Sequence, residues 1–370
     1  MASHRKRASA KPIPSIRGAR KVNPEVMIDG RKIGPDEPPY IICELSGNHN
    51  GSLDRALAMI DAAADTGCDA IKLQTYSPDS LTIASDKPDF RISGGLWDGR
   101  TLYDLYEEAH TPFDWHEALF TRARDRGVTI FSTPFDEYGA DLLADLGAPA
   151  YKIASFEAVD LALIAHVARK GKPMIISTGL SGLGDIERAV ATARDNGCEE
   201  LVLLHCISSY PAPDDQSNLR TIPHLAQAFD TVVGLSDHTM GTAVSVAAVA
   251  LGARVIEKHF TLARADGGPD SAFSLEPDEF RRLCDETRAC FTALGRVSYQ
   301  IAPAEKANRA FRRSLYAVAD IAPGEELTAT NTRSIRPGYG LAPHYRDQVL
   351  GRRARTAIAR GTALNWELLA

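Results

Sequence analysis

Short runs of apolar residues recur along the middle of the chain, and each run breaks into polar residues at its end. They are rich in Val, Ile and Leu and six to eight residues long, which is typical of buried parallel strands. The pattern predicts eight strands, at residues 40–46, 70–76, 129–135, 150–155, 174–179, 201–208, 232–238 and 255–262.

Helical periodicity separates these runs, most clearly at residues 52–65, 114–126, 161–170, 185–197, 242–251 and 277–294. Eight strands alternating with helices over roughly 250 residues predict an α/β fold of the (β/α)8 or TIM barrel type, which we assign to residues 25–295. An open doubly wound sheet is the alternative. No G-x-G-x-x-G follows the first run, which weakens the dinucleotide-binding form of that alternative.

Two segments depart from this alternation. Residues 77–111 are rich in Gly, Pro and Asp and too long for a simple connection, so we expect a loop over the active face. After a linker at residues 296–311, residues 312–370 hold short strand-like pieces punctuated by Pro323-Gly324, Pro337-Gly338 and Gly361. Such punctuation predicts a small second domain.

Composition narrows the class of protein. Residues 1–24 carry seven Lys/Arg and no apolar core of a signal peptide, so we expect a disordered solvated tail. No basic stripe or aromatic platform follows that would indicate a nucleic-acid partner, and no apolar run is long enough to span a membrane. The six cysteines form no C-x-x-C pair, as in cytoplasmic proteins with reduced thiols.

Polar residues gather where the predicted strands end, and in a β/α barrel that edge is the catalytic face. Lys72 and Lys152 lie there with hydroxyls that form a suitable cradle for a phosphate and a carboxylate. Ion pairing of these lysines with Glu44 or Glu157 is the alternative. The candidate cradle comprises Lys72, Thr133, Lys152, Ser155, Ser177 and Ser236.

His238 and His259 end neighbouring predicted strands. Two neutral imidazoles on adjacent strands can hold one divalent ion, with water or substrate oxygens in its other positions. Mn, Co, Zn or Fe suit nitrogen ligands, and Mg suits a site that is mainly water-coordinated. The alternative is a pair of unrelated buried histidines.

Several motifs in series resemble the sialic acid synthase family. They are Glu44-x-x-x-Asn48-His49-Asn50-Gly51, Lys72-Leu-Gln74, Ser132-Thr-Pro-Phe135, Lys152-Ile-Ala-Ser155-x-Glu157, Ser177-Thr-Gly179, Gly234-Leu-Ser-Asp-His238 and Glu257-Lys-His259. Arg336-Pro-Gly-Tyr-Gly340 resembles the antifreeze-like (SAF, β-clip) domain of those enzymes. The resemblance covers residues 40–367, and motifs in series are far more specific than any one of them.

The resemblance implies a transferase that forms a C–C bond between phosphoenolpyruvate and the open aldehyde form of an acetamido sugar, releasing phosphate. The candidate cradle would bind phosphoenolpyruvate, and His238 and His259 would hold a divalent metal such as Mn, Mg or Co. We expect Glu44 to orient or deprotonate the water that adds to the substrate. The sugar would be contacted by Glu44, Gln74, Glu157, Tyr210, Asp270, Phe311 and Arg336, with Arg336 supplied by the partner chain of a domain-swapped homodimer.

Two stretches resemble the pseudaminic acid synthase branch of that family, residues 95–106 and 264–271. That branch implies 2,4-diacetamido-2,4,6-trideoxy-L-altrose as the acceptor. Synthases for N-acetylneuraminate carry an Asn two residues before the tyrosine of the sixth strand, whereas this chain has Ser208 before Tyr210.

The alternatives within the family are an N-acetylneuraminate or a legionaminate synthase. A non-catalytic carbohydrate- or ice-binding protein would have no need of Lys72, Lys152, His238 and His259. A different barrel lyase or aldolase would use Lys152 as a Schiff base and resist chelators.

Overall fold

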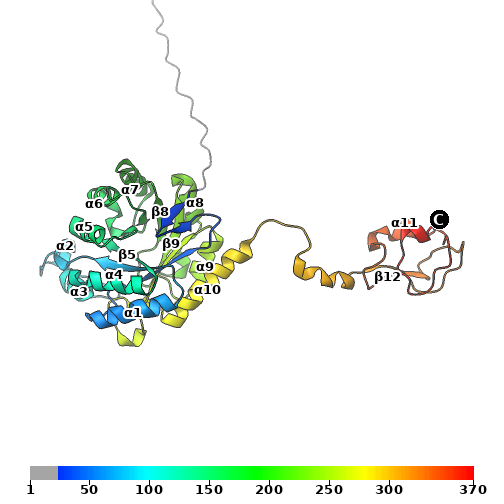
Figure 1. The fold of residues 1–370 in the computed structure, drawn as a ribbon, viewed down its shortest axis with the longest axis horizontal. Helices are drawn as coiled ribbons and strands as arrows, with labels where there is room; N and C mark the ends of the chain where they lie inside the picture. Colours follow the sequence, from blue (N-terminus) through cyan, green and yellow to red (C-terminus); the bar gives the residue numbers. More distant parts are fainter. Residues whose placement is uncertain (1–23) are drawn as a thin grey trace, which may run out of the picture. The chain divides into compact units, whose positions relative to one another are not determined.

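A computed structural model describes residues 24–370 of the chain, which divides into two compact units, one ending at Gly295 and one beginning at Arg296. Figure 1 shows both units, which are described separately below. The predicted tail at residues 1–24 lies outside the described residues except for Pro24. Across the part of the chain that is described, no helix has the length and apolar character needed to cross a membrane.

The first unit is a closed barrel of eight parallel strands, in the order β10-β3-β4-β5-β6-β7-β8-β9. The predicted TIM barrel is therefore confirmed, and the open sheet is excluded because β10 pairs with β3 along its whole length. The strands are β3 Tyr40–Glu44, β4 Ala70–Thr75, β5 Thr129–Pro134, β6 Tyr151–Ile153, β7 Met174–Ser177, β8 Leu201–Cys206, β9 Val232–Asp237 and β10 Val255–His259.

Helices surround the barrel because each buries one apolar stripe against the strands. In α1 (Leu53–Asp65) the buried residues are Ala56, Met59, Ile60 and Ala63, spaced as one face of a helix requires. Its first turn is capped by Ser52, whose hydroxyl accepts from the backbone N–H of Arg55. The others are α4 His116–Asp125, α5 Glu137–Asp145, α6 Leu161–Ala168, α7 Leu183–Asp195, α8 Thr221–Phe229, α9 Ala243–Ala250 and α10 Pro277–Leu294.

A hairpin that the sequence pattern did not predict precedes the barrel. Strands β1 (Val26–Ile28) and β2 (Arg31–Ile33) are antiparallel and joined by Asp29-Gly30, both with positive φ, as a tight two-residue turn requires. Val26, Ile28 and Ile33 are buried in one cluster with residues near the starts of the barrel strands. The hairpin therefore closes the amino-terminal end of the barrel.

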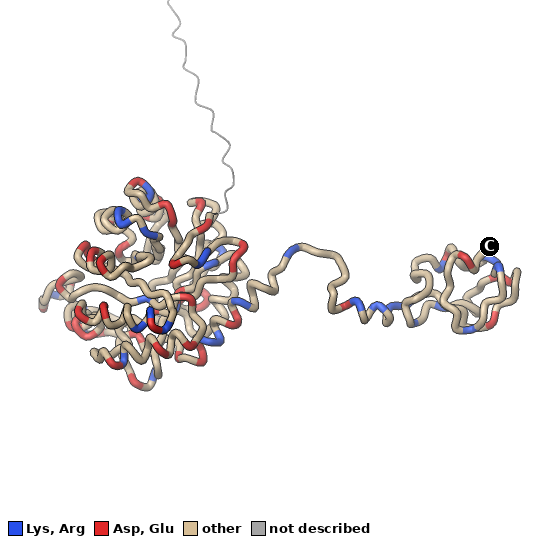
Figure 2. Tube along the Cα trace, in the orientation of Figure 1, with Lys and Arg blue, Asp and Glu red and all other residues tan. Residues whose placement is uncertain are grey.

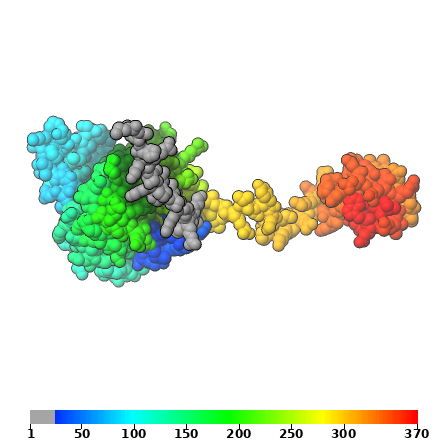
Figure 3. Space-filling model, turned by 90° about the horizontal axis from the view of Figure 1, so that it is seen from above, coloured from blue at the N-terminus to red at the C-terminus, as the bar shows by residue number. Residues whose placement is uncertain are grey.

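The segment at residues 77–111 is only partly a loop. It contains two short helices, α2 (Pro78–Leu81) and α3 (Leu102–Ala109), with Thr101 capping α3 through its hydroxyl. Two glycines with positive φ, Gly94 and Gly95, make the turn between them. Figure 3 shows this part of the chain in cyan as a lobe that projects from the barrel.

The second unit has its own small core. Strand β11 (Ser314–Ala317) pairs antiparallel with β12 (Thr332–Ile335), and a short helix, α11 (Arg346–Val349), follows. The buried residues include Leu315, Leu327 and Leu364. Figure 2 shows basic residues gathered just before β11, where Lys306, Arg309, Arg312 and Arg313 lie, whereas acidic and basic residues alternate over the barrel helices.

Candidate active site

A cavity of about 400 Å³ lies at the carboxyl ends of the barrel strands. It is lined by every predicted site residue of the barrel except Glu44. Phe311 and Arg336 belong to the second unit, and their roles stay predictions. The predicted residues that line the cavity are Lys72, Gln74, Thr133, Lys152, Ser155, Glu157, Ser177, Tyr210, Ser236, His238, His259 and Asp270.

Four buried charged groups form a network beneath and along one side of this cavity. The Lys72 ammonium pairs with Glu44 and lies 3.7 Å from Oε1 of Glu257. The Lys152 ammonium lies 3.3 Å from the same Glu257 oxygen. Lys72 also donates to Oγ1 of Thr133 over 3.1 Å. No side chain of the four charged residues is more than 5% exposed, so each charge depends on its partners.

Strand register brings these groups together. Glu44 is opposite Lys72 in the pairing of β3 with β4, and His259 is opposite Glu44 in the pairing of β10 with β3. Glu257 is opposite Ser236 in the pairing of β10 with β9. Because neighbouring parallel strands end at one edge, residues far apart in sequence become neighbours there.

Burial and neighbouring charges shift the pKa of each group in this network. Burial raises the pKa of Glu44 to about 7, although Lys72 counteracts it. Burial would lower the pKa of Lys72, but Glu257 and Glu44 outweigh it and raise the pKa above its ordinary value. Burial lowers the pKa of Lys152 despite Glu257. Proton uptake by Glu44 near neutral pH would leave the network with a net positive charge, which favours an anionic ligand.

The hydroxyls that line the cavity are held differently from one another. Ser236 donates to Oε1 of Glu257 over 3.2 Å, and Oγ of Ser155 accepts from the N–H of Gly179 over 3.1 Å. The Ser177 hydroxyl is buried and has no hydrogen-bond partner in the part of the chain that the structure describes. A buried donor without a partner is costly unless a ligand satisfies it. We name Lys72, Thr133, Lys152, Ser155, Ser177 and Ser236 the polar floor.

His238 and His259 lie side by side, with ring centroids 5.3 Å apart. Nδ1 of His238 lies 3.0 Å from the carbonyl oxygen of Ile207, and Nδ1 of His259 lies 3.3 Å from Oγ of Ser46. A proton on Nδ1 of His238, donated to that carbonyl, leaves Nε2 free as a ligand atom. The pair therefore fits a divalent metal held by two imidazoles.

Among the described residues, carboxylates and thiols do not complete such a site. Within residues 24–370, no group of three or more His, Cys, Asp or Glu side chains is placed to hold a metal. Oδ2 of Asp270 lies 3.8 Å from Nδ1 of His259, and Sγ of Cys206 lies 3.8 Å from Nδ1 of His238. Any ion on the two histidines would therefore take its remaining ligands from water or substrate, as predicted for an open site.

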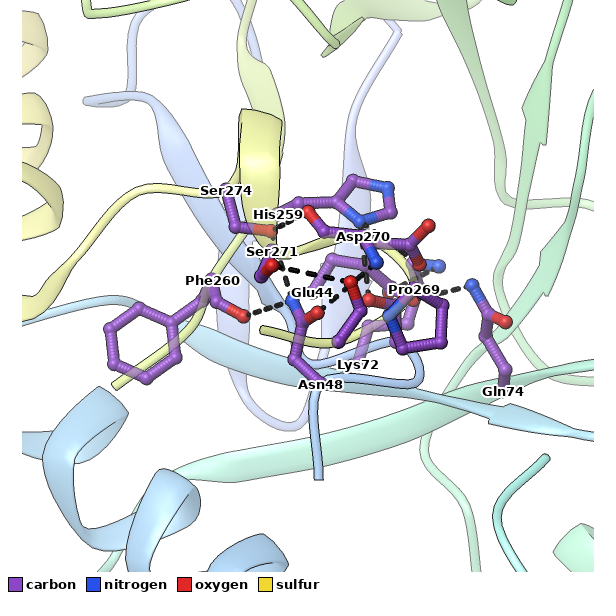
Figure 4. Close-up of polar contacts among 12 residues, drawn as sticks. Glu44, Asn48, Lys72, Gln74, His259, Phe260, Pro269, Asp270, Ser271 and Ser274 are labelled. Atoms are coloured by element: carbon purple, nitrogen blue, oxygen red, sulfur yellow. Dashed lines mark hydrogen bonds and ion pairs between the residues drawn. The ribbon is translucent and has the colours of Figure 1, made fainter. Parts of the chain in front are cut away.

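Asn48 ties together the two loops beside His259 (Figure 4). Its amide group donates to the carbonyl oxygen of Phe260 and to Oγ of Ser274, both over 2.9 Å. Its side-chain oxygen accepts from the N–H of Asp270 over 3.3 Å. Asn48 is fully buried, so these bonds fix Asp270 at the edge of the cavity.

The segment at residues 77–111 supplies a second, apolar part of the lining. It contributes Leu81, Ile92, Trp97, Leu102, Leu105, Tyr106 and Ala109, of which we name the first six the apolar wall. Tyr210 connects the two parts, because its ring lies 5.6 Å from that of Trp97 and 4.5 Å from that of His238, centroid to centroid.

The structure also shows site residues that sequence reasoning missed or misplaced. Glu257 was part of a quoted motif but was not assigned to the site, although it is two residues before His259 and so shares its face of β10. Glu44 is wholly buried and does not line the cavity. It acts on the cavity through Lys72 and through Gln74, whose amide donates to it over 3.0 Å.

Comparisons with known proteins agree with this geometry. The model of the NeuB family matches residues 59–299, and that of the SAF domain matches residues 312–370. The chain is 45% identical over 329 residues to a pseudaminic acid synthase of Campylobacter jejuni, covering 89% of this chain and 96% of the relative. It is 40% identical over 330 residues to a pseudaminic acid synthase of Helicobacter pylori, covering 89% and 97%.

Among solved structures, an N-acetylneuraminic acid synthetase from Leptospira borgpetersenii matches with a TM-score of 0.69 and 31% identity, covering 77% of this chain and 95% of that one. The barrel fold and the C-terminal domain thus agree with one assignment. The chain belongs to the NeuB family and carries a SAF domain at residues 312–370.

Proposed function

We propose that this chain is a pseudaminic acid synthase, which condenses phosphoenolpyruvate with 2,4-diacetamido-2,4,6-trideoxy-L-altrose and water to give a nine-carbon acid and phosphate. At the coarser level the chain is an enzyme of nonulosonic acid synthesis, a transferase that forms a C–C bond. The acceptor rests on the identity to the two pseudaminic acid synthases.

The polar floor is the observation that carries the assignment of phosphoenolpyruvate. This substrate is a small anion with a phosphate and a carboxylate, and Lys72 and Lys152 offer two buried ammonium groups beside several hydroxyls. The Ser177 hydroxyl has no hydrogen-bond partner among residues 24–370, and a substrate oxygen would satisfy it. A protein that only binds neutral sugars would gain nothing from burying these lysines.

The bond-forming step would take place between the floor and the histidines. C3 of phosphoenolpyruvate attacks the aldehyde carbon of the sugar, and water adds at C2 before phosphate leaves. A divalent metal on His238 and His259 would polarise the aldehyde oxygen. Lys72 and Lys152 would hold the anion and neutralise the charge that the phosphate carries away.

We keep Glu44 as the group that orients or deprotonates the attacking water. Its support is a pKa raised to about 7 by burial, which suits a group that exchanges a proton near neutral pH. Because Glu44 does not line the cavity, its action would pass through Lys72 and Gln74. Normal turnover by the Glu44→Gln variant would exclude this role.

We also propose a domain-swapped homodimer in the cytoplasm, in which a second copy supplies Arg336 to the sugar. Apolar residues stand exposed on the loops and first helical turns after several barrel strands, namely Tyr138, Phe156, Val159, Leu180, Leu183 and Met240. Exposed apolar residues gathered at one end of a barrel are typical of a surface that another domain covers. Sedimentation velocity of the full chain would test the dimer.

The test of function is phosphate release from phosphoenolpyruvate by the purified protein, with the trideoxy-altrose or N-acetylmannosamine, each with and without EDTA. Release that needs metal and occurs with the altrose sugar alone would establish the reaction and the acceptor. Release with N-acetylmannosamine instead would keep the mechanism and change the acceptor. No release with either would favour a binding protein, and release that resists EDTA would favour a Schiff base on Lys152.

A further inference from the structure

The apolar wall is the part of the cavity that the reaction itself does not use. Of its six residues, only Trp97 and Tyr106 carry a polar side-chain atom. Leu105 is buried, and the other five are partly buried while they line the cavity. When an apolar ligand group covers apolar surface that faces a cavity, that surface is removed from water and binding becomes more favourable.

Contacts beyond the segment hold the wall in place. Nε1 of Trp97 donates to the carbonyl oxygen of Pro269 over 2.9 Å, so its one polar atom is already used. The Tyr106 ring packs edge-on against Tyr76, with centroids 6.0 Å apart, and Tyr76 packs likewise against Phe135 at 5.1 Å. These contacts preorganise the wall, so little free energy is lost in ordering it when a ligand binds.

The chemistry of the acceptor fixes which of its ends meets this wall. Its aldehyde carbon must reach the polar floor and the two histidines, where phosphoenolpyruvate and the metal would be bound. The opposite end, C5 and C6, therefore extends away from the strand ends toward the residues of the 77–111 segment. A hydroxyl at C6 would lose its water there without gaining a partner, whereas a methyl group would be buried favourably.

We propose that the apolar wall determines specificity for an acceptor with a methyl group at C6 in place of a hydroxymethyl group. The inference rests on the proposed function, because it assumes that the aldehyde faces the floor. It assigns the choice of sugar to the segment between β4 and β5, and the bond-forming chemistry to the strand ends.

The test compares two acceptors that differ only at C6, the trideoxy-altrose and its 6-hydroxy analogue, by kcat/KM for phosphate release. One methyl group in an apolar pocket distinguishes substrates by about 10- to 200-fold, and we expect the wild type to prefer the deoxy sugar by that range. The Leu102→Asn variant, which places an amide in the wall, should lower this ratio by about tenfold or more. Trp97→Ala should lower it in the same direction.

Leu96→Ala is the matched control. Leu96 is next to Trp97 and 46% exposed, and it does not line the cavity. This variant should keep the wild-type ratio. If Leu102→Asn and Trp97→Ala reduce kcat/KM equally for both sugars, the wall only supports the fold of the segment, and the proposal is wrong.

A second measurement separates this proposal from the choice of acceptor. If N-acetylmannosamine is the acceptor, the same comparison is made between it and its 6-deoxy analogue, and a preference for the hydroxylated sugar overturns the proposal. Saturation-transfer NMR needs no turnover. In it, the C6 methyl protons of the altrose sugar should receive the strongest saturation from the wild type and lose it with Leu102→Asn, and weak saturation in the wild type also overturns the proposal.

Discussion

The polar floor and the apolar wall line one cavity but differ in the chemistry of their side chains and in the elements that carry them. The floor consists of buried charges and hydroxyls on neighbouring strand ends, where Lys72, Lys152 and Glu257 hold one another in place. The wall consists of partly buried apolar side chains on one inserted segment, anchored by contacts such as that of Trp97 with Pro269. In this barrel, the charged groups stand on the sheet, and the apolar groups that we propose to select the sugar stand on an inserted segment.

Removal of one floor charge should give the largest effect. In the Lys72→Met variant Glu44 loses its ion pair and Glu257 keeps only Lys152, and breaking a buried pair costs about 3–5 kcal/mol of the free energy of unfolding. Urea denaturation at pH 8, where Glu44 is largely ionised, measures the loss. The control is Lys170→Met, which breaks a surface pair with Asp141 and should scarcely change stability. Equal losses in the two variants would mean that the floor is not specially dependent on pairing.

Loss of the amide that joins the two loops should have an intermediate effect. Asn48→Ala removes two buried hydrogen bonds and a partly buried third and leaves partners unsatisfied, at a cost of about 1–3 kcal/mol. We expect a lower melting temperature and a lower kcat/KM for the sugar, because Asp270 is released.

Asn50 offers a control for that variant, since it reaches the same loop from an exposed position. Asn50→Asp is preferable to Ala, because φ of 52° at this residue is tolerated by Asp and poorly by Ala. Its stability should stay within about 0.5 kcal/mol of the wild type. A loss as large as that of Asn48→Ala would show that exposed contacts hold the loop equally well.

A smaller effect on stability is expected when position 97 keeps an aromatic ring but loses its hydrogen bond to Pro269. Trp97→Phe removes the hydrogen bond to Pro269, worth about 0.5–1.5 kcal/mol, and keeps an aromatic surface. Thermal unfolding should register a small decrease, while the preference for the deoxy sugar is retained. If the preference disappears instead, the hydrogen bond rather than the apolar surface sets it.

A further prediction concerns Glu157, a carboxyl that lines the cavity and should make the stability of the protein depend on pH. Burial raises its pKa from the ordinary 4.5 to about 7. Because the folded state favours the protonated form, stability is highest at low pH and declines as the pH rises from about 4.5 through about 7. The melting temperature of the wild type relative to Glu157→Gln should fall between pH 5 and pH 8. A constant difference would contradict the raised pKa.

Much of the barrel could be predicted from the sequence because its signals are local. Each apolar run predicts one strand, and the polar residues that follow the run lie on the catalytic face. Glu257 was missed because it lies within an apolar run rather than after it. Its role appears only when β10 is paired with β9.

Other features depend on contacts between distant segments. The β1–β2 hairpin has strands of three residues, too short to show a period, and is stabilised by the barrel interior that it covers. The wall residues are spread over a segment whose composition indicates only a loop. Glu44 lies at the end of a predicted strand, where the pattern indicates a site residue. Its side chain nevertheless pairs with Lys72 and does not line the cavity.

The hairpin that closes the amino-terminal end of the barrel affects how molecules reach and leave the cavity. A cavity sealed at its base has a single mouth, so molecules must enter and leave by the same route. Under the proposed function, phosphate released at the polar floor would leave by the same opening through which the substrates enter. Val26, Ile28 and Ile33 pack there with residues inside the barrel, so the end of the barrel farthest from the site offers no second route.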